Sequence, residues 1–142
     1  MMKPVAFWDS SALIPLCVSQ PMTDTARWLE ERYGIVAWWA TQVEIISGLT
    51  RLERMGQITH ERFLVGKQIA REIVQDWHSV GSTKSIALDA CSLLELYPLR
   101  AADALQLAAA LEWCEGNPKG QVFLTFDQRL AEAAAKAGFT LE

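Results

Sequence analysis

The sequence of 142 residues predicts an α/β fold: one three-layer α/β/α domain over residues 1–142 with a central parallel sheet of four or five strands. Short apolar segments typical of strands alternate with longer segments in which apolar residues recur at helical spacing. The strand segments are apolar at nearly every position, as in parallel sheets that helices cover on both faces. Hydrophobic residues make up 51% of the chain and charged residues 21%, which is typical of a globular protein.

The first elements follow from short local signals. A strand is expected at Val5–Trp8, where four apolar residues precede a polar run. Ser10 or Ser11 is expected to cap a helix to about position 18, because serine hydroxyls accept hydrogen bonds from the free N–H groups of a helix start. The next helix opens at 21–23 and stops at a glycine, and a second strand is expected at 35–39.

The rest of the chain continues this alternation. Thr41, Thr59 and Asp127 are expected to cap helices, and Pro98 separates two segments rich in alanine and leucine. Gly138 is expected to end the last helix. These signals predict helices at 41–56, 59–75, 86–97, 100–115 and 127–137, and strands at 77–80 (weak), 122–126 and 139–141.

Composition excludes several classes of site. Three widely spaced cysteines argue against a disulfide framework or a structural zinc site, and two histidines cannot form a three-histidine metal centre. The net charge of −4 excludes a general polyanion binder, so a nucleic-acid substrate would need a basic patch or a metal ion. The start of the chain lacks the pattern of a signal peptide and no segment is long and apolar enough for a membrane span, so we expect a cytoplasmic protein.

Four acidic residues stand at positions where an α/β protein binds ligands. Asp9 and Asp127 each follow an expected strand, and the carboxyl ends of parallel strands meet at one edge of the sheet. Asp103 and Glu44 lie in the first turns of expected helices, among apolar or small neighbours. Gly48 is on the same helical face as Glu44, and we expect it to leave space for Glu44 to approach Asp9.

The residues alone leave two interpretations of these acids open. Asp9 and Asp127 suit helix N-caps, and Asp103 and Glu44 suit first-turn acids that complement the helix dipole. Together, however, four carboxylates in apolar surroundings would repel one another, and burying an unpaired carboxylate is costly. A bound divalent cation would remove that difficulty, and ligands that are all oxygen suit Mg²⁺ or Mn²⁺.

Four motifs follow one another along nearly the whole chain. Asp-Ser-Ser-Ala-Leu follows the first strand at 9–13, and Thr-x-x-Glu stands at 41–44. Leu-Arg-Ala-Ala-Asp-Ala-Leu-Gln-Leu-Ala-Ala-Ala-Leu fills 99–111, and Phe-Leu-Thr-Phe-Asp-x-x-Leu fills 123–130. In this order and spacing the chain resembles PIN-domain ribonucleases, especially the VapC-type toxins of toxin–antitoxin pairs. The segment 56–85 matches only in length and helical character.

The resemblance implies a PIN-like fold and a metal-dependent endoribonuclease with Mg²⁺ or Mn²⁺ as cofactor. It makes Asp9, Glu44, Asp103 and Asp127 the catalytic acids. Asp9 and Asp103 would hold the metal, with Asp127 bound directly or through water. Glu44 would orient or deprotonate the attacking water, or hold a second ion, and Thr125 matches a hydroxyl position nearby. The implied partners are an RNA substrate, a cognate antitoxin that inhibits the enzyme, and a second copy of the chain.

Two rival functions remain open at this point: a DNA nuclease on the same fold, and a binding module whose acids are only helix caps. The apolar excess predicts a homodimer, with the helices after Thr23 and Gly56 as contact faces. Basic residues outnumber acidic ones between positions 51 and 71. This segment is either a face that follows phosphates or an ordinary solvated surface.

Overall fold

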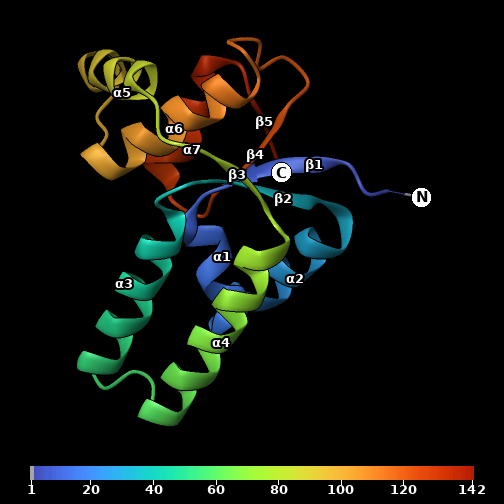
Figure 1. Ribbon diagram of the computed structural model, residues 1–142, viewed down its shortest axis with the longest axis vertical. Coiled ribbons are helices and arrows are strands. Elements are labelled where there is room, and N and C mark those ends of the chain that lie inside the picture. Colours follow the sequence, from blue (N-terminus) through green and yellow to red (C-terminus); the bar gives the residue numbers. More distant parts are fainter. Residues whose placement is uncertain (1) are drawn as a thin grey trace.

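The computed structural model describes residues 2–142, in which strands and helices alternate through most of the chain (Figure 1). The strands are β1 (Val5–Trp8), β2 (Gly34–Trp38), β3 (His78–Val80), β4 (Val122–Leu124) and β5 (Thr140–Leu141). The helices are α1 (Ser10–Cys17), α2 (Thr23–Arg32), α3 (Thr41–Arg54), α4 (His60–Asp76), α5 (Lys84–Leu96), α6 (Ala101–Trp113) and α7 (Gln128–Ala137).

The five strands form one sheet in the order β3-β2-β1-β4-β5, and every neighbouring pair is parallel. The predicted α/β fold with a parallel sheet is therefore confirmed. From β1 the chain builds outward through β2 to β3, and then crosses to the other side of β1 to form β4. Such a reversal of strand order opens a crevice at the carboxyl ends of the two strands beside it, here β1 and β4.

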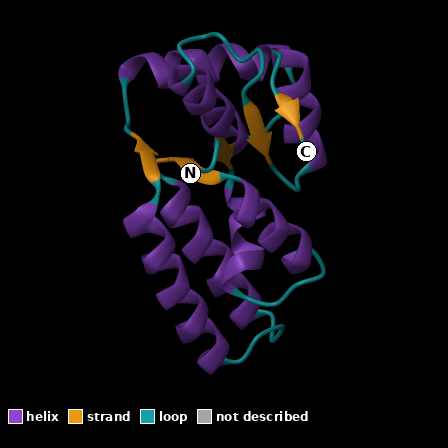
Figure 2. Ribbon diagram, turned by 90° about the vertical axis from the view of Figure 1, so that its right-hand side faces the viewer, coloured by secondary structure: helices purple, strands orange, loops and turns teal. Residues whose placement is uncertain are grey.

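Helices cover both faces of the sheet, which gives the expected three layers (Figure 2). Helices α1 to α4 pack on one face, where Trp8 and Leu124 are buried. Helices α5 to α7 pack on the other face around Phe7 and Phe123, whose ring centroids are 5.4 Å apart. Neighbouring strand residues thus point to opposite layers, and this accounts for the apolar residues on both faces of the three central strands β2, β1 and β4.

Two of the predicted helix caps are wrong. The N-cap of α1 is Asp9, whose side chain accepts from the Ala12 N–H, while Ser10 and Ser11 lie inside the first turn. Helix α3 begins after Ala40 without a side-chain cap, because the hydroxyl of Thr41 bonds a residue of another helix. The predicted caps Thr59 and Asp127 are confirmed: they accept from the N–H groups of Arg62 and Leu130.

Strand β4 ends two residues earlier than predicted, at Leu124. Thr125 and Phe126 leave the sheet and make hydrogen bonds to Ser11 in the first turn of α1. Within residues 2–142, none of the helices combines the length and the apolar character that a membrane crossing requires.

Candidate active site at the carboxyl ends of β1 and β4

Asp9 lies at the crevice between the two central strands. It directly follows β1, and its backbone N–H donates to the carbonyl oxygen of Leu124 at the end of β4, 3.1 Å away. Its side chain is only 3% exposed. The Oδ1 atom accepts from the Ser11 hydroxyl at 2.7 Å and from the Ala12 N–H at 3.4 Å. The carboxylate is therefore buried and oriented by the start of α1.

Ser11 joins Asp9 to the segment that follows β4. Its hydroxyl donates to Asp9, accepts from the Phe126 N–H at 2.8 Å, and lies 3.1 Å from the Thr125 hydroxyl. Thr125 in turn accepts from the Asp127 N–H at 3.0 Å. The loop that carries Asp127 is thus attached to the helix that carries Asp9. The sequence suggested only a capping role for Ser11, because Thr125 and Phe126 are more than a hundred positions away.

Glu44 reaches the same region from the first turn of α3. Its Oε1 accepts from the Ser10 hydroxyl at 3.0 Å, so Glu44 lies beside the helix start that Asp9 caps. Gly48 lies where α3 contacts α1. A Cβ at Gly48 would come within 2.5 Å of the Ile14 Cδ1, so Ile14 of α1 fills the space that the glycine leaves. Gly48 lets α1 and α3 pack closely, which brings Ser10 to Glu44.

Gln106 is a second partner of Glu44, and its role was not predicted from the sequence. Its Nε2 lies 3.2 and 3.1 Å from the two carboxylate oxygens of Glu44, and 2.9 Å from the Thr41 hydroxyl. Gln106 is one helical turn after Asp103 on α6, and Thr41 is one turn before Glu44 on α3. The only sequence signal was a polar residue within an otherwise apolar stretch of helix.

Asp103 and Asp127 complete the set of four acids. Asp103 lies half-buried in the first turn of α6. Asp127 caps α7, where its Oδ1 accepts from the Leu130 N–H at 3.0 Å. The structure thus places each predicted site residue at the first turn or the N-cap of a helix, and Asp9, Glu44 and Asp127 are linked by hydroxyl groups of α1 and of the segment after β4.

The charges of the four acids influence one another. Burial raises the pKa of Asp9 to about 7, against hydrogen bonds from Ser11, Thr125 and Ala12, and the Glu44 charge raises this pKa further. Burial also raises the pKa of Glu44, as does the charge of Asp103. The pKa of Asp103 is raised first by burial and then by the charge of Asp127. The repulsion therefore runs without a break from Asp9 through Glu44 and Asp103 to Asp127.

Neutral donors make the hydrogen bonds to these side chains. Serine hydroxyls, the Gln106 amide and backbone N–H groups bind them, and within residues 2–142 no lysine or arginine forms an ion pair with any of the four. Burial raises the pKa of Asp103 and the charge of Arg100 lowers it without forming an ion pair, and within the described residues no positive charge acts in this way on Asp9 or Glu44. The negative charge lies on oxygen atoms, which suits Mg²⁺ or Mn²⁺. In the described chain, however, no three acidic, histidine or cysteine side chains are gathered as a metal site. The ligand set Asp9, Asp103 and Asp127 stays a prediction.

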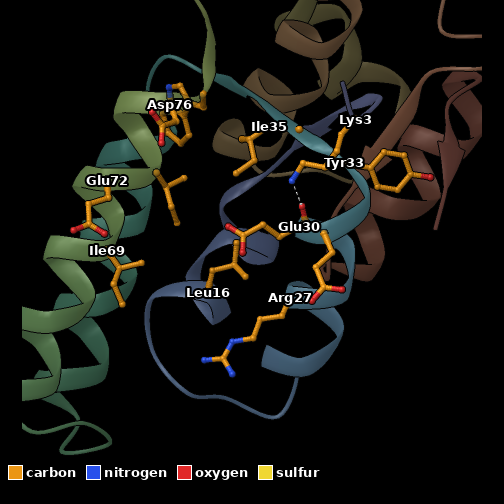
Figure 3. A pocket seen from close by; sticks show the side chains of 13 residues that line it. Lys3, Leu16, Arg27, Glu30, Tyr33, Ile35, Ile69, Glu72 and Asp76 are labelled. Atoms are coloured by element: carbon orange, nitrogen blue, oxygen red, sulfur yellow. Dashed lines mark hydrogen bonds between the residues drawn. The ribbon is translucent and has the colours of Figure 1, made fainter. Parts of the chain in front are cut away.

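A hollow of about 600 Å³ lies elsewhere, between α2 and α4 (Figure 3). Lys3, Gly34 and Trp77 line it, and they stand at or just before the starts of β1, β2 and β3. The hollow is therefore at the amino ends of the strands, opposite the four acids. Apolar side chains such as Ile69 form part of its wall, and charged side chains of α2 and α4, including Glu72, face it.

Comparisons with known proteins identify the fold. No family model matches the chain, and no curated protein matches it. Among solved structures, VapC20 of Mycobacterium tuberculosis, a toxin that cleaves the sarcin–ricin loop, matches with a TM-score of 0.66 and 18% identity over 95% of this chain and 96% of that chain. A toxin–antitoxin complex from Klebsiella pneumoniae matches with a TM-score of 0.63 and 18% identity over 89% and 90% of the two chains.

A third match, the protein PAE2754 of Pyrobaculum aerophilum, has a TM-score of 0.68 and 16% identity over 99% of this chain and 90% of that chain. These matches cover nearly the full length of both partners, so they compare whole architectures and not a shared fragment. The chain therefore has the α/β fold of the PIN-domain toxins of the VapC type, as its motifs indicated.

Proposed function

We propose that this chain is a metal-dependent endoribonuclease that cleaves RNA phosphodiester bonds, and that it is the toxin of a toxin–antitoxin pair. The observation that carries the proposal is the run of four carboxylates near the carboxyl ends of β1 and β4, in which the charge of each acid acts on the next and none forms an ion pair within residues 2–142. A metal-dependent nuclease needs such charge to bind the cation that in turn binds phosphate. An RNA-cleaving toxin among the proteins with this fold supports RNA as the substrate.

Each acid has a distinct role in this proposal. Asp9 and Asp103 would hold Mg²⁺ or Mn²⁺, and Asp127 would join them directly or through water. A cation held there would lower the pKa of a bound water and neutralise charge on the phosphate during an in-line displacement. Glu44, fixed by Ser10 and Gln106, accepts the proton of the attacking water. Burial raises the pKa of Glu44, and this makes its carboxylate a stronger base.

The alternative of a binding module has one observation in its favour, since Asp9 and Asp127 do cap α1 and α7. A cap, however, is normally solvated, and capping requires neither the burial that raises the pKa of Asp9 to about 7 nor a second carboxylate nearby. Glu44 and Asp103 lie in the first turns of α3 and α6, where an acid complements the helix dipole, and the Asp103 side chain also accepts from the Arg100 N–H. Neither role requires the burial that raises the pKa of both groups.

Cleavage by the purified protein tests the proposal and its DNA alternative together. Labelled single-stranded RNA and DNA of one sequence are incubated with Mg²⁺, with Mn²⁺ and with a chelator. We expect RNA fragments only with metal, and a fall of several orders of magnitude in Asp9→Asn and Asp103→Asn. Asp89→Asn, an exposed acid of α5, is the matched control and should cleave normally. Cleavage of DNA alone would favour the alternative, and normal cleavage by either site variant would refute the assignment.

The proposed antitoxin is the second partner to test. A toxin–antitoxin complex among the proteins with this fold supports such a partner. Co-expression with the neighbouring reading frame should yield a stable complex that no longer cleaves RNA. Full cleavage by that complex would refute the inhibitory partner.

A further inference from the structure

One buried amide connects the two helices that carry Glu44 and Asp103. Gln106 is 1% exposed, and its Nε2 is within hydrogen-bond distance of both carboxylate oxygens of Glu44. The same nitrogen donates to the Thr41 hydroxyl at 2.9 Å, and Thr41 is fully buried. An amide nitrogen carries two hydrogens, so it can serve a hydroxyl and a carboxylate together. Both donors of Gln106 therefore point at the first turn of α3.

The acceptor half of this amide has no partner. Among residues 2–142, Gln106 Oε1 is one of the few buried polar atoms without a hydrogen bond. The other buried residues of α6 are alanines and a leucine. Burying an unpaired acceptor is unfavourable, so packing alone would favour an apolar residue at this position. The donors, and not the acceptor, explain why an amide suits the site.

We propose that Gln106 is a positioning residue: its amide holds the Glu44 carboxylate close to the part of α6 that carries Asp103. The inference rests on the proposed nuclease function and deepens it. Gln106 and Asp103 are one turn apart on one rigid helix, so the distance between the predicted base and a predicted metal ligand is set by α6. Ser10 holds the same carboxylate from α1. Three elements thus fix Glu44 without placing a positive charge beside it.

A purely structural role is the competing explanation, in which Gln106 only ties α6 to Thr41. The two roles make different demands. If Gln106 only ties the helices together, Thr41→Val and Gln106→Met should reduce activity equally, because each removes the hydrogen bond between Thr41 and Gln106. A positioning role depends on the bond to Glu44, which Thr41→Val leaves in place. Gln106→Met keeps the length of the side chain and removes both donors.

A double-mutant cycle of Gln106→Met and Glu44→Gln separates these roles. In the wild-type background we expect Gln106→Met to lower kcat for a short RNA about 10- to 100-fold with KM nearly unchanged, since hydrogen bonds to charged groups are strong. In the Glu44→Gln background the same change should have no further effect. Thr41→Val should lose much less activity than Gln106→Met. Circular dichroism checks that each variant is folded, and Gln106→Asn, whose amide is too short to reach Glu44, is a second variant with the same expected loss.

A measurement without RNA makes the inference independent of cleavage. The carboxyl carbon of Glu44 is titrated by NMR in metal-free protein, where the charges that act on it are those of Asp9 and Asp103. Loss of the donating amide should lower the acid dissociation constant of Glu44 about tenfold in Gln106→Met. An unchanged titration, or equal losses of kcat in both backgrounds, would overturn the role of Gln106. Absence of cleavage by the wild type, with the titration changed as expected, would overturn the nuclease function alone.

Discussion

Replacing Asp9 by asparagine should stabilise the metal-free protein at alkaline pH. Asp9 is 3% exposed, and burial is the main reason that its pKa is raised from 3.8 to about 7. Asparagine has nearly the same size, and its Oδ1 can accept the hydrogen bonds that Ser11 and Ala12 now donate. It is also an equally good N-cap for α1. The substitution therefore removes the buried charge and little else.

The size and the sign of the effect follow from linkage. The folded state binds the Asp9 proton more tightly than the unfolded chain does, since the pKa is raised from 3.8 to about 7. Below about pH 4 the group is protonated in both states, and charge costs nothing. As the pH rises from there through 7, the buried charge lowers the free energy of unfolding by an increasing amount. The full loss is on the order of 4 kcal/mol, at 1.36 kcal/mol per pKa unit. Asp9→Asn should gain most of this at pH 8 and nothing at pH 4.

Urea unfolding followed by tryptophan fluorescence measures the difference, because the chain has six tryptophans. Wild type and variant are compared in chelator at about pH 8, 6 and 4. Added Mg²⁺ should stabilise the wild type at pH 8 much more than Asp9→Asn, because the variant lacks one of the proposed carboxylate ligands. Asp89→Asn is the control and should show no pH-dependent gain. A variant less stable than the wild type at pH 8 in chelator would refute the buried-charge argument.

Three further predictions concern the base, the hydroxyl link and assembly. Glu44→Gln should lower the cleavage rate at least about a hundredfold with a nearly unchanged melting temperature, and Glu95→Gln on α5 should cleave normally in the same gel assay. Ser11→Ala should lower the free energy of unfolding by about 1–3 kcal/mol in urea titrations, because the Phe126 N–H loses its acceptor; unchanged stability would contradict this. The chain should sediment as a dimer at micromolar concentration. Leu64→Glu with Val65→Glu, at exposed apolar positions of α4, should shift it toward monomer, and a monomeric wild type would contradict the prediction.

The architecture followed from the sequence because local signals agreed with one another. The central strands are apolar at nearly every position, which is typical of a sheet covered on both faces, and the structure has such a sheet. The differences lie at element ends, where long-range bonds decide. Strand β4 stops at Leu124 because Thr125 and Phe126 bond to Ser11, and Thr41 caps no helix because its hydroxyl accepts from Gln106.

The site was predictable to unequal degrees for the four acids. Asp9 and Asp127 follow strands, so the geometry of parallel sheets alone placed them at one edge. Glu44 and Asp103 stand on helices, and only the resemblance to PIN domains assigned them to the same site. The electrostatic coupling of the four residues in the structure agrees with that assignment. Gly48 was predicted to allow a close approach, but the residue that approaches it, Ile14, is on a helix whose packing the sequence does not reveal.

The neutral donors at the site explain why carboxylates so unfavourably placed can persist in a folded chain. Ser10, Ser11 and Gln106 come from α1 and α6, and their partners lie on other elements, so each hydrogen bond also holds two elements together. A lysine in their place would neutralise the carboxylate and compete with a divalent cation for it. Serine and glutamine satisfy the oxygen atoms but leave the charge in place. The fold thus tolerates the repulsion through hydrogen bonding, and the charge remains available to a cation.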